Sequence, residues 1–402
     1  MALSVKIKKM ARYVYFYGKD QVKIWGLTVP ERLKRLLGSQ VKELKDPSQL
    51  TPEDEVFIFN VDYLLDDRLV KYLGTQPGLL VYQKEGPKEI PLAAYVSAPI
   101  FAETLAYFEG RGPLPQGVKT QLLREISAAF FKQLRKFEPP FALPVSEKNR
   151  DFLERRLYDW SYKGVTDLVT KWLWPHPARK AVRWCVKLGL KPNHVTFLGF
   201  ILVVLAGYLF YQGHLGLGLI VAWLMTFLDT VDGKLARVTV TSSKFGHYFD
   251  HLIDLIHPPI WYILWGVGVE RWGLSNPLPV SLLGTLLIAG YVLGRLVEGA
   301  FLARFGFEIF CWRPFDSYFR LITARRNPCL IILTVSYLLG QPQYGLLATT
   351  CWTVLTSLVL LFRLALAWWQ GRKRPLTPWL AEIEKYRAHK LALKWFTREA
   401  AA

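Results

Sequence analysis

Long apolar runs in the second half of the chain are the feature that most constrains its fold. Five of them reach or approach the roughly 20 residues that an α-helix needs to cross a bilayer. These runs are Val195–Phe210, Leu215–Leu228, Leu252–Val269, Val280–Ala303 and Leu346–Trp369, and Cys329–Gly340 is a shorter sixth candidate. Buried helices of a soluble protein would carry amphipathic stripes and polar caps, which these runs mostly lack. The sequence therefore predicts an α-helical integral membrane protein with six transmembrane helices.

Basic residues give these helices an orientation. If the residues before 190 are cytosolic, the connections on the far side are YQGHLG, VERWGLSNPLP and GQPQYG, which hold a single basic residue, Arg271. The connections on the near side carry basic residues such as Lys234, Arg304 and Arg313, and the tail begins with GRKRP. Because Lys and Arg gather in cytoplasmic loops, we predict that both termini are cytoplasmic.

The chain is strongly basic, with a formal net charge of +19 over 402 residues. No nucleic-acid recognition motif accompanies this charge, and its placement follows the predicted topology. We therefore expect membrane lipids with anionic headgroups as partners, and no nucleic acid.

The first 143 residues differ from the rest, since short β-rich runs alternate with helical ones. RYVYFY, EVFIFN, GLLVYQ and LAAYVS read as strands, and PERLKRLLG reads as a helix between them. This alternation predicts a small cytosolic α/β domain over residues 1–143, with a largely parallel sheet. Asp62 follows a strand-like run and so would lie where such sheets bind ligands. A helix or turn cap explains Asp62 almost as well.

Residues 144–192 interleave aromatic, aliphatic and basic residues at helical spacing. We predict one or two amphipathic juxtamembrane helices on the cytoplasmic membrane surface, with Trp160, Trp172, Trp174 and Trp184 at headgroup depth. Ordinary amphipathic core helices are the alternative. The six-span domain would then cover residues 193–371, and residues 372–402 would form a basic cytosolic tail.

Four aspartates stand within or beside these apolar segments. Asp229 and Asp232 lie three residues apart at the inner end of the second predicted span, and Asp250 and Asp254 lie four apart at the start of the third. Each pair therefore shares one helix face, and a short link between antiparallel helices would bring the pairs together. Four clustered carboxylates in a low-dielectric setting require compensating cations. All-oxygen ligation suits Mg²⁺, Mn²⁺ or Ca²⁺, and four carboxylates can hold two ions.

Small and basic residues lie between the aspartates. Gly233, Ala236 and Gly246 leave room for a bulky ligand beside the backbone, and Arg237 offers a charge for a phosphate. Close packing of membrane helices is the alternative role of the small residues.

The whole pattern, D-x2-D-G-x2-A-R-x8-G-x3-D-x3-D from Asp229 to Asp254, resembles the signature of the CDP-alcohol phosphotransferases. These are integral membrane enzymes that make phospholipid headgroups. The resemblance covers roughly Lys191–Gln370. It includes the opening sequence KPNHVT, which contains Asn193 and Thr196 and is similar to the usual entry sequence of the family.

The resemblance implies that Asp229, Asp232, Asp250 and Asp254 bind Mg²⁺ or Mn²⁺, with two ions expected. Asp254 would also be the general base that takes the proton from an acceptor hydroxyl, which attacks the phosphorus nearest the alcohol and displaces CMP. This agrees with the chemistry of the residues, since a carboxylate beside bound cations can abstract a proton during attack. The substrate-binding residues would be Asn193, Thr196, Gly233, Ala236, Arg237 and Gly246.

The family resemblance also implies the substrates. A CDP-alcohol would be the donor, with CDP-diacylglycerol as the default because spans open to lipid admit acyl chains. An alcohol or phospho-alcohol would be the acceptor, in phospholipid biosynthesis, and we expect a homodimer. An active site on the predicted inner rim would be cytoplasmic. An ion-coupled transporter is a remote alternative, because the carboxylates cluster at one rim and not at mid-membrane.

The N-terminal region resembles a second known module. Some family members carry a fused cytidylyltransferase, as in the bifunctional enzymes that make CDP-inositol and then di-myo-inositol phosphate phosphate. VKIWGLTVPERLKRLLG and FIFNVDYLLDD are similar in tone to parts of those fusions. The glycine-rich loop expected within Met1–Asp20 is missing, so we expect a degenerate nucleotidyltransferase-like domain. A di-myo-inositol phosphate phosphate synthase that uses CDP-inositol and inositol phosphate is the alternative function.

Three arginines suggest that one substrate is anionic. Arg295 interrupts an apolar span, where an unpaired guanidinium is costly, and Arg325 and Arg326 introduce the fifth predicted span. Glu298, three residues from Arg295, can neutralise it on the same helix, and lipid phosphates can attract the other two. Because all three belong to inner ends of spans that flank one basic loop, we predict that they bind an anionic headgroup.

Overall fold

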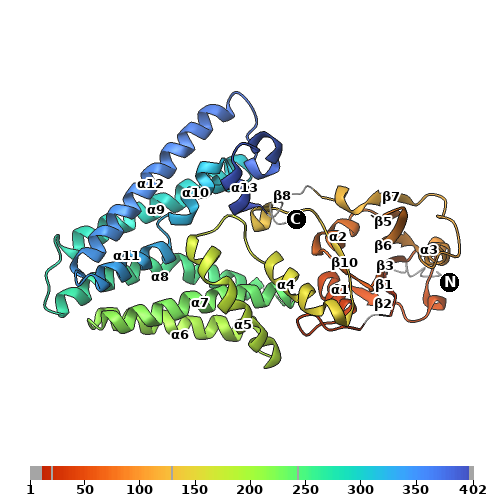
Figure 1. The fold of residues 1–402 in the computed structure, drawn as a ribbon, viewed down its shortest axis with the longest axis horizontal. Coiled ribbons are helices and arrows are strands. Elements are labelled where there is room, and N and C mark those ends of the chain that lie inside the picture. The colour runs from red at the N-terminus through yellow and green to blue at the C-terminus, as the bar shows by residue number, and fades with distance from the viewer. Residues whose placement is uncertain (1–10, 20, 128–129, 242–243, 398–402) are drawn as a thin grey trace, which may run out of the picture. The chain divides into compact units, whose positions relative to one another are not determined.

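The computed structural model describes residues 11–19, 21–127, 130–241 and 244–397 (Figure 1). The chain divides into two compact units, which we call the α/β unit (residues 1–129 and 139–160) and the helical unit (residues 130–138 and 161–402). The α/β unit thus continues past residue 143, and the helical unit includes a short segment that precedes it in the chain. The functional limits predicted at residues 143, 192 and 371 stay predictions.

One sheet forms the base of the α/β unit. Its described strands follow the order β2-β1-β3-β6-β5-β7. Their bounds are β1 (Arg12–Tyr17), β2 (Val41–Glu43), β3 (Glu55–Asn60), β5 (Leu79–Glu85), β6 (Lys88–Ser97) and β7 (Lys119–Leu122). Strand β6 runs antiparallel to its neighbours β3 and β5, and the other pairs are parallel. The predicted α/β sheet domain is therefore confirmed, with a single reversed strand among those described.

The local sequence explains these elements. Strand β3 is a continuous apolar run because it lies between two other strands and is buried along nearly its whole length. Helix α1 (Val29–Leu37) begins with a capping box, in which Thr28 Oγ1 accepts from Glu31 N and Glu31 Oε2 accepts from Thr28 N at 2.8 Å. The further helices are α2 (Asp67–Leu73) and α3 (Phe101–Phe108).

The chain returns to this unit after residue 138. Strand β10 (Ala142–Pro144) pairs antiparallel with β4 (Tyr63–Leu65), and helix α4 (Arg150–Trp160) follows. Trp25 Nε1 donates to the carbonyl oxygen of Glu154 at 2.8 Å, which fixes α4 to the unit. Trp160 is only 5% exposed. Its predicted place at headgroup depth is therefore wrong, because α4 packs its apolar residues into the α/β core.

The helical unit contains the apolar helices. Within the described residues, five helices are long and apolar enough to cross a membrane. They are α6 (Pro192–Tyr211), α7 (Leu215–Val238), α8 (Lys244–Arg271, with the apolar part Leu252–Arg271), α9 (Val280–Phe305) and α12 (Gln343–Gly371). Helix α11 (Arg326–Leu338) has 13 residues, or about 20 Å, and falls short of a full span. An integral multi-pass protein is thus supported, whereas the predicted count of six spans is not confirmed.

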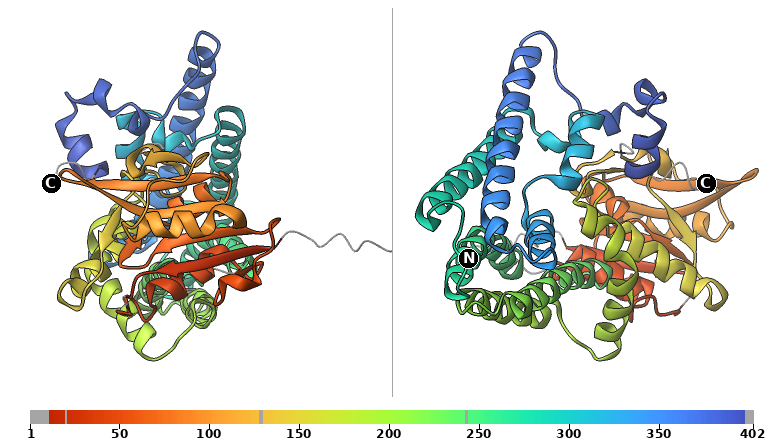
Figure 2. Two further views of the ribbon diagram at one scale, coloured as in Figure 1. Left: turned by 90° about the vertical axis from the view of Figure 1, so that its right-hand side faces the viewer. Right: turned by 60° about the vertical axis from the view of Figure 1, so that its left-hand side comes forward.

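The packing of the helices follows from their side chains. Helices α6 and α7 lie side by side, and α9 packs against α12 (Figure 2). Phe210, Trp261 and Trp265 are fully buried in the core where α6 meets α8. A Cβ at Gly268 would lie 1.8 Å from the carbonyl oxygen of Phe210, so only glycine allows this approach. Outward-facing apolar side chains such as Phe362 are exposed, as expected for a lipid-facing surface.

Short elements complete the helical unit. They are β8 (Phe130–Phe131), β9 (Lys136–Phe137), the π-helical turn Val169–Leu173, α5 (Pro175–Lys187), α10 (Pro314–Ile322) and α13 (Lys390–Phe396). Trp184 on α5 is 70% exposed, and only Ala178 and Val182 of this helix are buried, which fits a helix that lies on a membrane surface. Trp379 is fully buried, and its Nε1 donates to Ser317 Oγ at 2.9 Å. The predicted basic tail is therefore packed into the unit as far as Phe396.

Candidate active site

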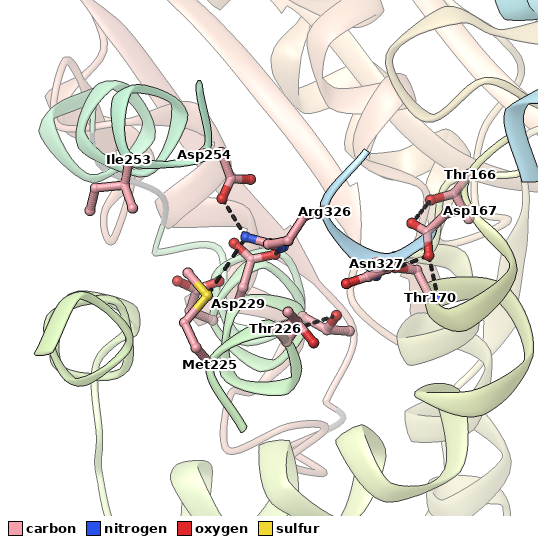
Figure 3. A network of polar contacts seen from close by, with 12 residues as sticks. Thr166, Asp167, Thr170, Met225, Thr226, Asp229, Ile253, Asp254, Arg326 and Asn327 are labelled. Atoms are coloured by element: carbon pink, nitrogen blue, oxygen red, sulfur yellow. Dashed lines mark hydrogen bonds and ion pairs between the residues drawn. The ribbon is translucent and has the colours of Figure 1, made fainter. Parts of the chain in front are cut away.

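Two of the predicted aspartates meet at one guanidinium group. Asp229 lies in the last turns of α7 and Asp254 lies on α8, and Arg326 at the start of α11 joins them (Figure 3). Arg326 Nη2 donates to Asp229 Oδ2 at 2.5 Å, and Nη1 donates to Asp254 Oδ1 at 2.5 Å. The predicted convergence of carboxylates from two helices is therefore present, with an arginine between them.

Asp232 lies one helical turn further along α7. It is 5% exposed, and its Oδ2 accepts a hydrogen bond from Thr196 Oγ1 on α6 at 2.7 Å. A buried carboxylate requires such a partner. Thr196, which was predicted to bind substrate, thus contacts a predicted metal ligand.

The fourth aspartate cannot be placed in the same way. Asp250 belongs to α8, but its side chain lies outside the described residues. Among the described side chains, no group of three or more His, Cys, Asp or Glu residues is arranged to hold a metal ion. The predicted four-carboxylate metal site therefore stays a prediction.

A polar cavity of about 240 Å³ lies beside Asp229 and Asp254. Its wall comes from helices α7 to α11 and from the segment that precedes α5. The lining residues are Lys163, Thr166, Asp167, Thr170, Asp229, Thr230, Gly233, Lys234, Arg237, Asp254, Pro258, Tyr291, Arg320, Arg325, Arg326 and Asn327. More of these side chains are cationic than anionic, which makes the cavity suitable for a phosphate-bearing ligand.

The charges in this cavity influence one another. Burial lowers the pKa of Lys163 to about 8, and the cations Arg135, Arg237 and Arg320 act in the same direction. Burial acts to raise the pKa of Asp167, but Arg320 and the hydrogen bonds to Asp167 outweigh it and hold that pKa below its usual value.

The other predicted substrate residues divide into two groups. Gly233 and Arg237 line the cavity, and a Cβ at Gly233 would come within 3.1 Å of Arg237 Nη2. Asn193 is exposed at the start of α6, and Asn193, Ala236 and Gly246 are absent from the described cavity wall. Their predicted contact with substrate stays a prediction.

Glu298 pairs with two of the predicted anion-binding arginines. Arg295 Nη2 donates to Glu298 Oε1 at 2.7 Å, and Arg325 Nη2 donates to Glu298 Oε2. Arg295 therefore contacts Glu298, the residue that the sequence suggested as its neutralising partner. Arg325 belongs to the cavity wall, whereas Arg295 does not appear among the described lining residues.

Sequence reasoning missed the contribution of residues 161–170. Lys163, Thr166, Asp167 and Thr170 line the cavity, although we had assigned this stretch to helices on the membrane surface. The polar run KGVTDLVT between aromatic residues was the available signal. Arg320 on α10 was missed because nothing in its sequence distinguishes it from other loop arginines.

An apolar groove flanks α8 next to the cavity. It lies between α6 and α8, has a volume of about 570 Å³, and is lined by residues such as Val204, Ile256 and Ile260. Ile253 points into this side of α8, away from Arg326, while Asp254 points toward Arg326 (Figure 3). A polar cavity and an apolar groove therefore lie on neighbouring faces of one helix.

Comparisons with known proteins bear on this arrangement. Residues 190–309 match the model of the family described as CDP-alcohol phosphatidyltransferase. The archaetidylinositol phosphate synthase of Pyrococcus horikoshii is 35% identical over 117 residues, which cover 28% of this chain and 59% of that protein. The bifunctional IPC transferase and DIPP synthase of Rubrobacter xylanophilus is 28% identical over 196 residues, which cover 49% of this chain and 42% of that protein.

The chain thus spans about half the length of these two relatives. Among solved structures, Mycobacterium tuberculosis phosphatidylinositol phosphate synthase PgsA1, in complex with manganese and citrate, aligns over 46% of this chain and 87% of its own. The sequence identity is 22% and the TM-score is 0.36, too low to indicate a shared fold. The family match includes Asp229 and Asp254, which Arg326 joins, and Asp232, which lies one helical turn from Asp229. Within the helical unit, residues 190–309 are therefore similar to the CDP-alcohol phosphatidyltransferase family.

Proposed function

We propose that the chain is a membrane phosphotransferase of phospholipid biosynthesis. It transfers a phospho-alcohol group, in our proposal a phosphatidyl group, from a CDP-alcohol to an acceptor hydroxyl and releases CMP. The observation that carries this proposal is the convergence of Asp229 and Asp254, from two helices, on the wall of a basic cavity.

The proposed reaction is a displacement at phosphorus. The acceptor oxygen forms a bond to the phosphorus nearest the alcohol of the donor, and the bond from that phosphorus to the CMP oxygen breaks. The acceptor proton goes to Asp254. Because Oδ1 of Asp254 binds Arg326, we assign Oδ2 as the atom that takes the proton. Arg237 on the cavity wall stabilises the charge of the leaving CMP.

The residues fit a divalent cation. Asp229 and Asp254 already share a positive charge, supplied by Arg326, and a buried third carboxylate, Asp232, lies one turn away. Carboxylate oxygens suit Mg²⁺ or Mn²⁺. We propose that Asp229, Asp232, Asp250 and Asp254 hold the metal, with two ions expected. When bound, the metal would neutralise the negative charge of the diphosphate.

The apolar groove favours a lipid donor. Its 570 Å³ volume and its apolar lining suit a hydrocarbon chain beside the polar cavity in which a diphosphate would bind. CDP-diacylglycerol therefore remains our first choice. CDP-inositol is the alternative, and the relative named bifunctional IPC transferase and DIPP synthase is the reason to test it.

We propose that the acceptor is anionic, such as a phospho-alcohol. Arg325 and Lys163 line the cavity and supply the charge. The name archaetidylinositol phosphate synthase makes an inositol-linked acceptor the first to try. The predicted role of Arg326 in anion binding is kept as part of this proposal, since it also lines the cavity. For Arg295 we propose that its ion pair with Glu298, which also pairs with Arg325, holds Arg325 in place.

The α/β unit is proposed to be a degenerate cytidylyltransferase-like domain with a scaffolding or regulatory role. Gly18 and Lys19 follow β1, where a nucleotide-binding loop would begin. Asp62 Oδ1 accepts from Lys19 N at 3.0 Å, so this carboxylate fastens the turn. The backbone at Gly18 has a φ of +110°, which favours glycine. This hydrogen bond supports the interpretation of Asp62 as a turn cap, which was the alternative to ligand binding.

The orientation and the assembly are further parts of the proposal. We propose cytoplasmic termini, a cytoplasmic active site and a homodimer. In a cysteine-free background, a cysteine at the exposed position Ser275 should react with an impermeant maleimide in intact cells, and one at Arg374 should react only after lysis. The reverse pattern would contradict the topology. Light scattering of the purified protein would test the dimer.

One assay tests the function as a whole. The purified full-length protein is incubated with Mg²⁺ or Mn²⁺, with CDP-diacylglycerol or CDP-inositol, and with inositol, inositol phosphate or glycerol phosphate, and CMP release is measured. We expect CMP only when donor and acceptor are both present. Absence of CMP with every pair would contradict the proposed function, and turnover of CDP-inositol alone would select the alternative donor.

A further inference from the structure

A hydrogen-bonded pair adjoins the arginine that joins the two aspartates. Asp167, from the segment before α5, accepts from Asn327 Nδ2 at 2.9 Å, and Asn327 directly follows Arg326 at the start of α11 (Figure 3). The two residues are 160 positions apart in the chain. Both lie outside the region 190–309 that matches the family model.

The surroundings fix the geometry of this pair. Asp167 Oδ1 also accepts from Thr170 N at 3.0 Å, and Asn327 Nδ2 also donates to Thr170 Oγ1 at 3.2 Å. Because a carboxylate oxygen can only accept, the amide nitrogen of Asn327 must face Asp167. The reversed amide would place two acceptors against each other.

Burial makes the pair costly to break. Asp167 is 7% exposed and Asn327 is 5% exposed, so a lost bond would leave polar atoms without water. The start of α11 also lacks a local support, since Arg325 at the N-cap position makes no side-chain cap hydrogen bond. The hydrogen bonds from Asn327 to the side chains of Asp167 and Thr170 therefore stabilise the first turn of α11 in place of a side-chain cap.

We propose that Asp167 is a positioning residue, which acts through Asn327 to hold Arg326 between Asp229 and Asp254. Rotation or fraying of the first turn of α11 would displace the Arg326 guanidinium by more than a hydrogen-bond length. Asp229 and Asp254 would then repel each other, and the base and the metal ligand would lose their fixed relation. The segment before the membrane helices is in this way a part of the active site.

The turnover measurement that tests this positioning role rests on the proposed function, whereas the Mn²⁺-binding measurement does not need turnover. The variants are Asn327→Asp, Asp167→Asn and the exchanged pair Asp167→Asn/Asn327→Asp. Asn327→Asp sets two carboxylates face to face, whereas the exchanged pair restores one hydrogen bond with donor and acceptor reversed. Thr334→Val is the matched control. It removes the hydrogen bond that Thr334 Oγ1 on α11 accepts from Trp223 Nε1 at 3.0 Å, two helical turns away from Asn327.

We expect Asn327→Asp to lower kcat/KM by about 10- to 100-fold and the exchanged pair to recover most of this loss. Asp167→Asn, which can still accept from Asn327, should lose less than Asn327→Asp. Thr334→Val should keep wild-type kcat/KM. In an Arg326→Lys background, Asn327→Asp should have little further effect, because the residue that it positions is already changed. The proposal would be overturned if the losses in kcat/KM from Arg326→Lys and Asn327→Asp multiplied in the double variant. It would also be overturned if the exchanged pair were no more active than Asn327→Asp.

A second measurement does not need turnover. Mn²⁺ binding is followed by electron paramagnetic resonance in the same variants. Asn327→Leu is added to this series because it removes the bond to Asp167 without adding a charge. Displacement of Arg326 removes a cation from the carboxylates, so Asn327→Leu should bind Mn²⁺ about threefold or more tightly than wild type, and the exchanged pair should keep the wild-type affinity. Equal affinities in Asn327→Leu and wild type would refute positioning. If the wild type releases no CMP from any donor, the proposed function fails and this binding series alone decides.

Discussion

Asp62 in the α/β unit and Asp254 in the helical unit were both candidate ligand-binding carboxylates in the sequence, and the structure places them in different settings. Asp62 follows a strand and accepts a hydrogen bond from the backbone of Lys19. Asp254 accepts from the Arg326 side chain on another helix and lines a cavity. One carboxylate stabilises a local turn, and the other takes part in a charge cluster assembled from distant parts of the chain.

The difference shows that the partner of a carboxylate indicates its role better than its place in an element. The backbone N–H paired with Asp62 satisfies a turn, and water can solvate the charge of this carboxylate because the hydrogen bond lies at the surface. The single guanidinium between Asp229 and Asp254 leaves one negative charge, with buried Asp232 nearby, which invites a further cation. The following predictions test this contrast.

The largest effect is expected from removing the proposed base. Asp254→Asn keeps the shape and still lets Oδ1 accept from Arg326, but it cannot take a proton. We expect a loss of about 10²- to 10⁴-fold in kcat with the fold unchanged, measured by CMP release and circular dichroism. Asp62→Asn is the control in the other unit and should be fully active. Near-wild-type turnover by Asp254→Asn would contradict its assignment as the base.

A smaller effect is expected from the hydrogen bond to Asp232. Thr196→Val keeps the volume of the side chain but removes the donor 2.7 Å from Asp232 Oδ2, leaving a buried carboxylate less well fixed. We expect kcat/KM to fall about 10- to 30-fold and the Mn²⁺ titration to shift. Thr196→Ser should behave like wild type because it keeps the hydroxyl. If Val and Ser variants behave alike, the hydrogen bond is irrelevant to the site.

These two residues also mark how far the sequence could lead. The spacing of Asp229, Asp232 and Asp254, together with the apolar runs, sufficed to predict the membrane helices and the convergence of their carboxylates, because helix periodicity and span length are local properties. The α/β sheet was predicted for the same reason. Arg326 could be named as a cavity residue, but its position between Asp229 and Asp254 depends on the packing of three helices.

The features that the sequence could not predict depend on packing between segments that are far apart in the chain. Lys163 and Asp167 read as parts of a surface helix, since nothing local tells that their segment folds against α7 and α11. The burial of Trp160 was missed for the same reason, because α4 belongs to a unit whose other elements come much earlier in the chain. The sixth span depended on a length criterion that α11 does not meet.

Lys163 allows a test by pH. Its pKa of about 8 lies below the ordinary value of 10.5, so the free protein loses this charge as the pH rises through 8. An anionic acceptor needs the charged form, and kcat/KM reports ionisations of the free enzyme. We therefore expect kcat/KM to fall as the pH rises above 8. The groups that face Lys163 are Arg135, Arg237, Glu308 and Arg320.

Lys163→Met serves as the matched variant for this profile. It should lower kcat/KM about fivefold at pH 7, because one charged contact to the anion is lost, and it should remove the decline above pH 8. Lys180→Met, which alters an exposed lysine of α5 outside the described cavity wall, should keep the wild-type profile. A decline above pH 8 that persists in Lys163→Met would assign the titration to another group.

The smallest effect on activity is expected from Asp62→Ala. This variant tests whether Asp62, unlike Asp254, has only a structural role. Lys19 N would lose its acceptor in a turn where Gly18 already adopts a positive φ, so the α/β unit should lose about 0.5–1.5 kcal/mol of stability. Differential scanning calorimetry would detect this as a lower unfolding temperature of the α/β unit. Turnover should change less than twofold, because Asp62 fastens a backbone turn and belongs to no described part of the cavity wall. Incubation of the wild type with CTP and a phospho-alcohol should likewise release no pyrophosphate. A tenfold loss of activity in Asp62→Ala with an unchanged unfolding temperature would reverse the contrast, since it would give Asp62 a role in ligand binding that its hydrogen bond to Lys19 does not require.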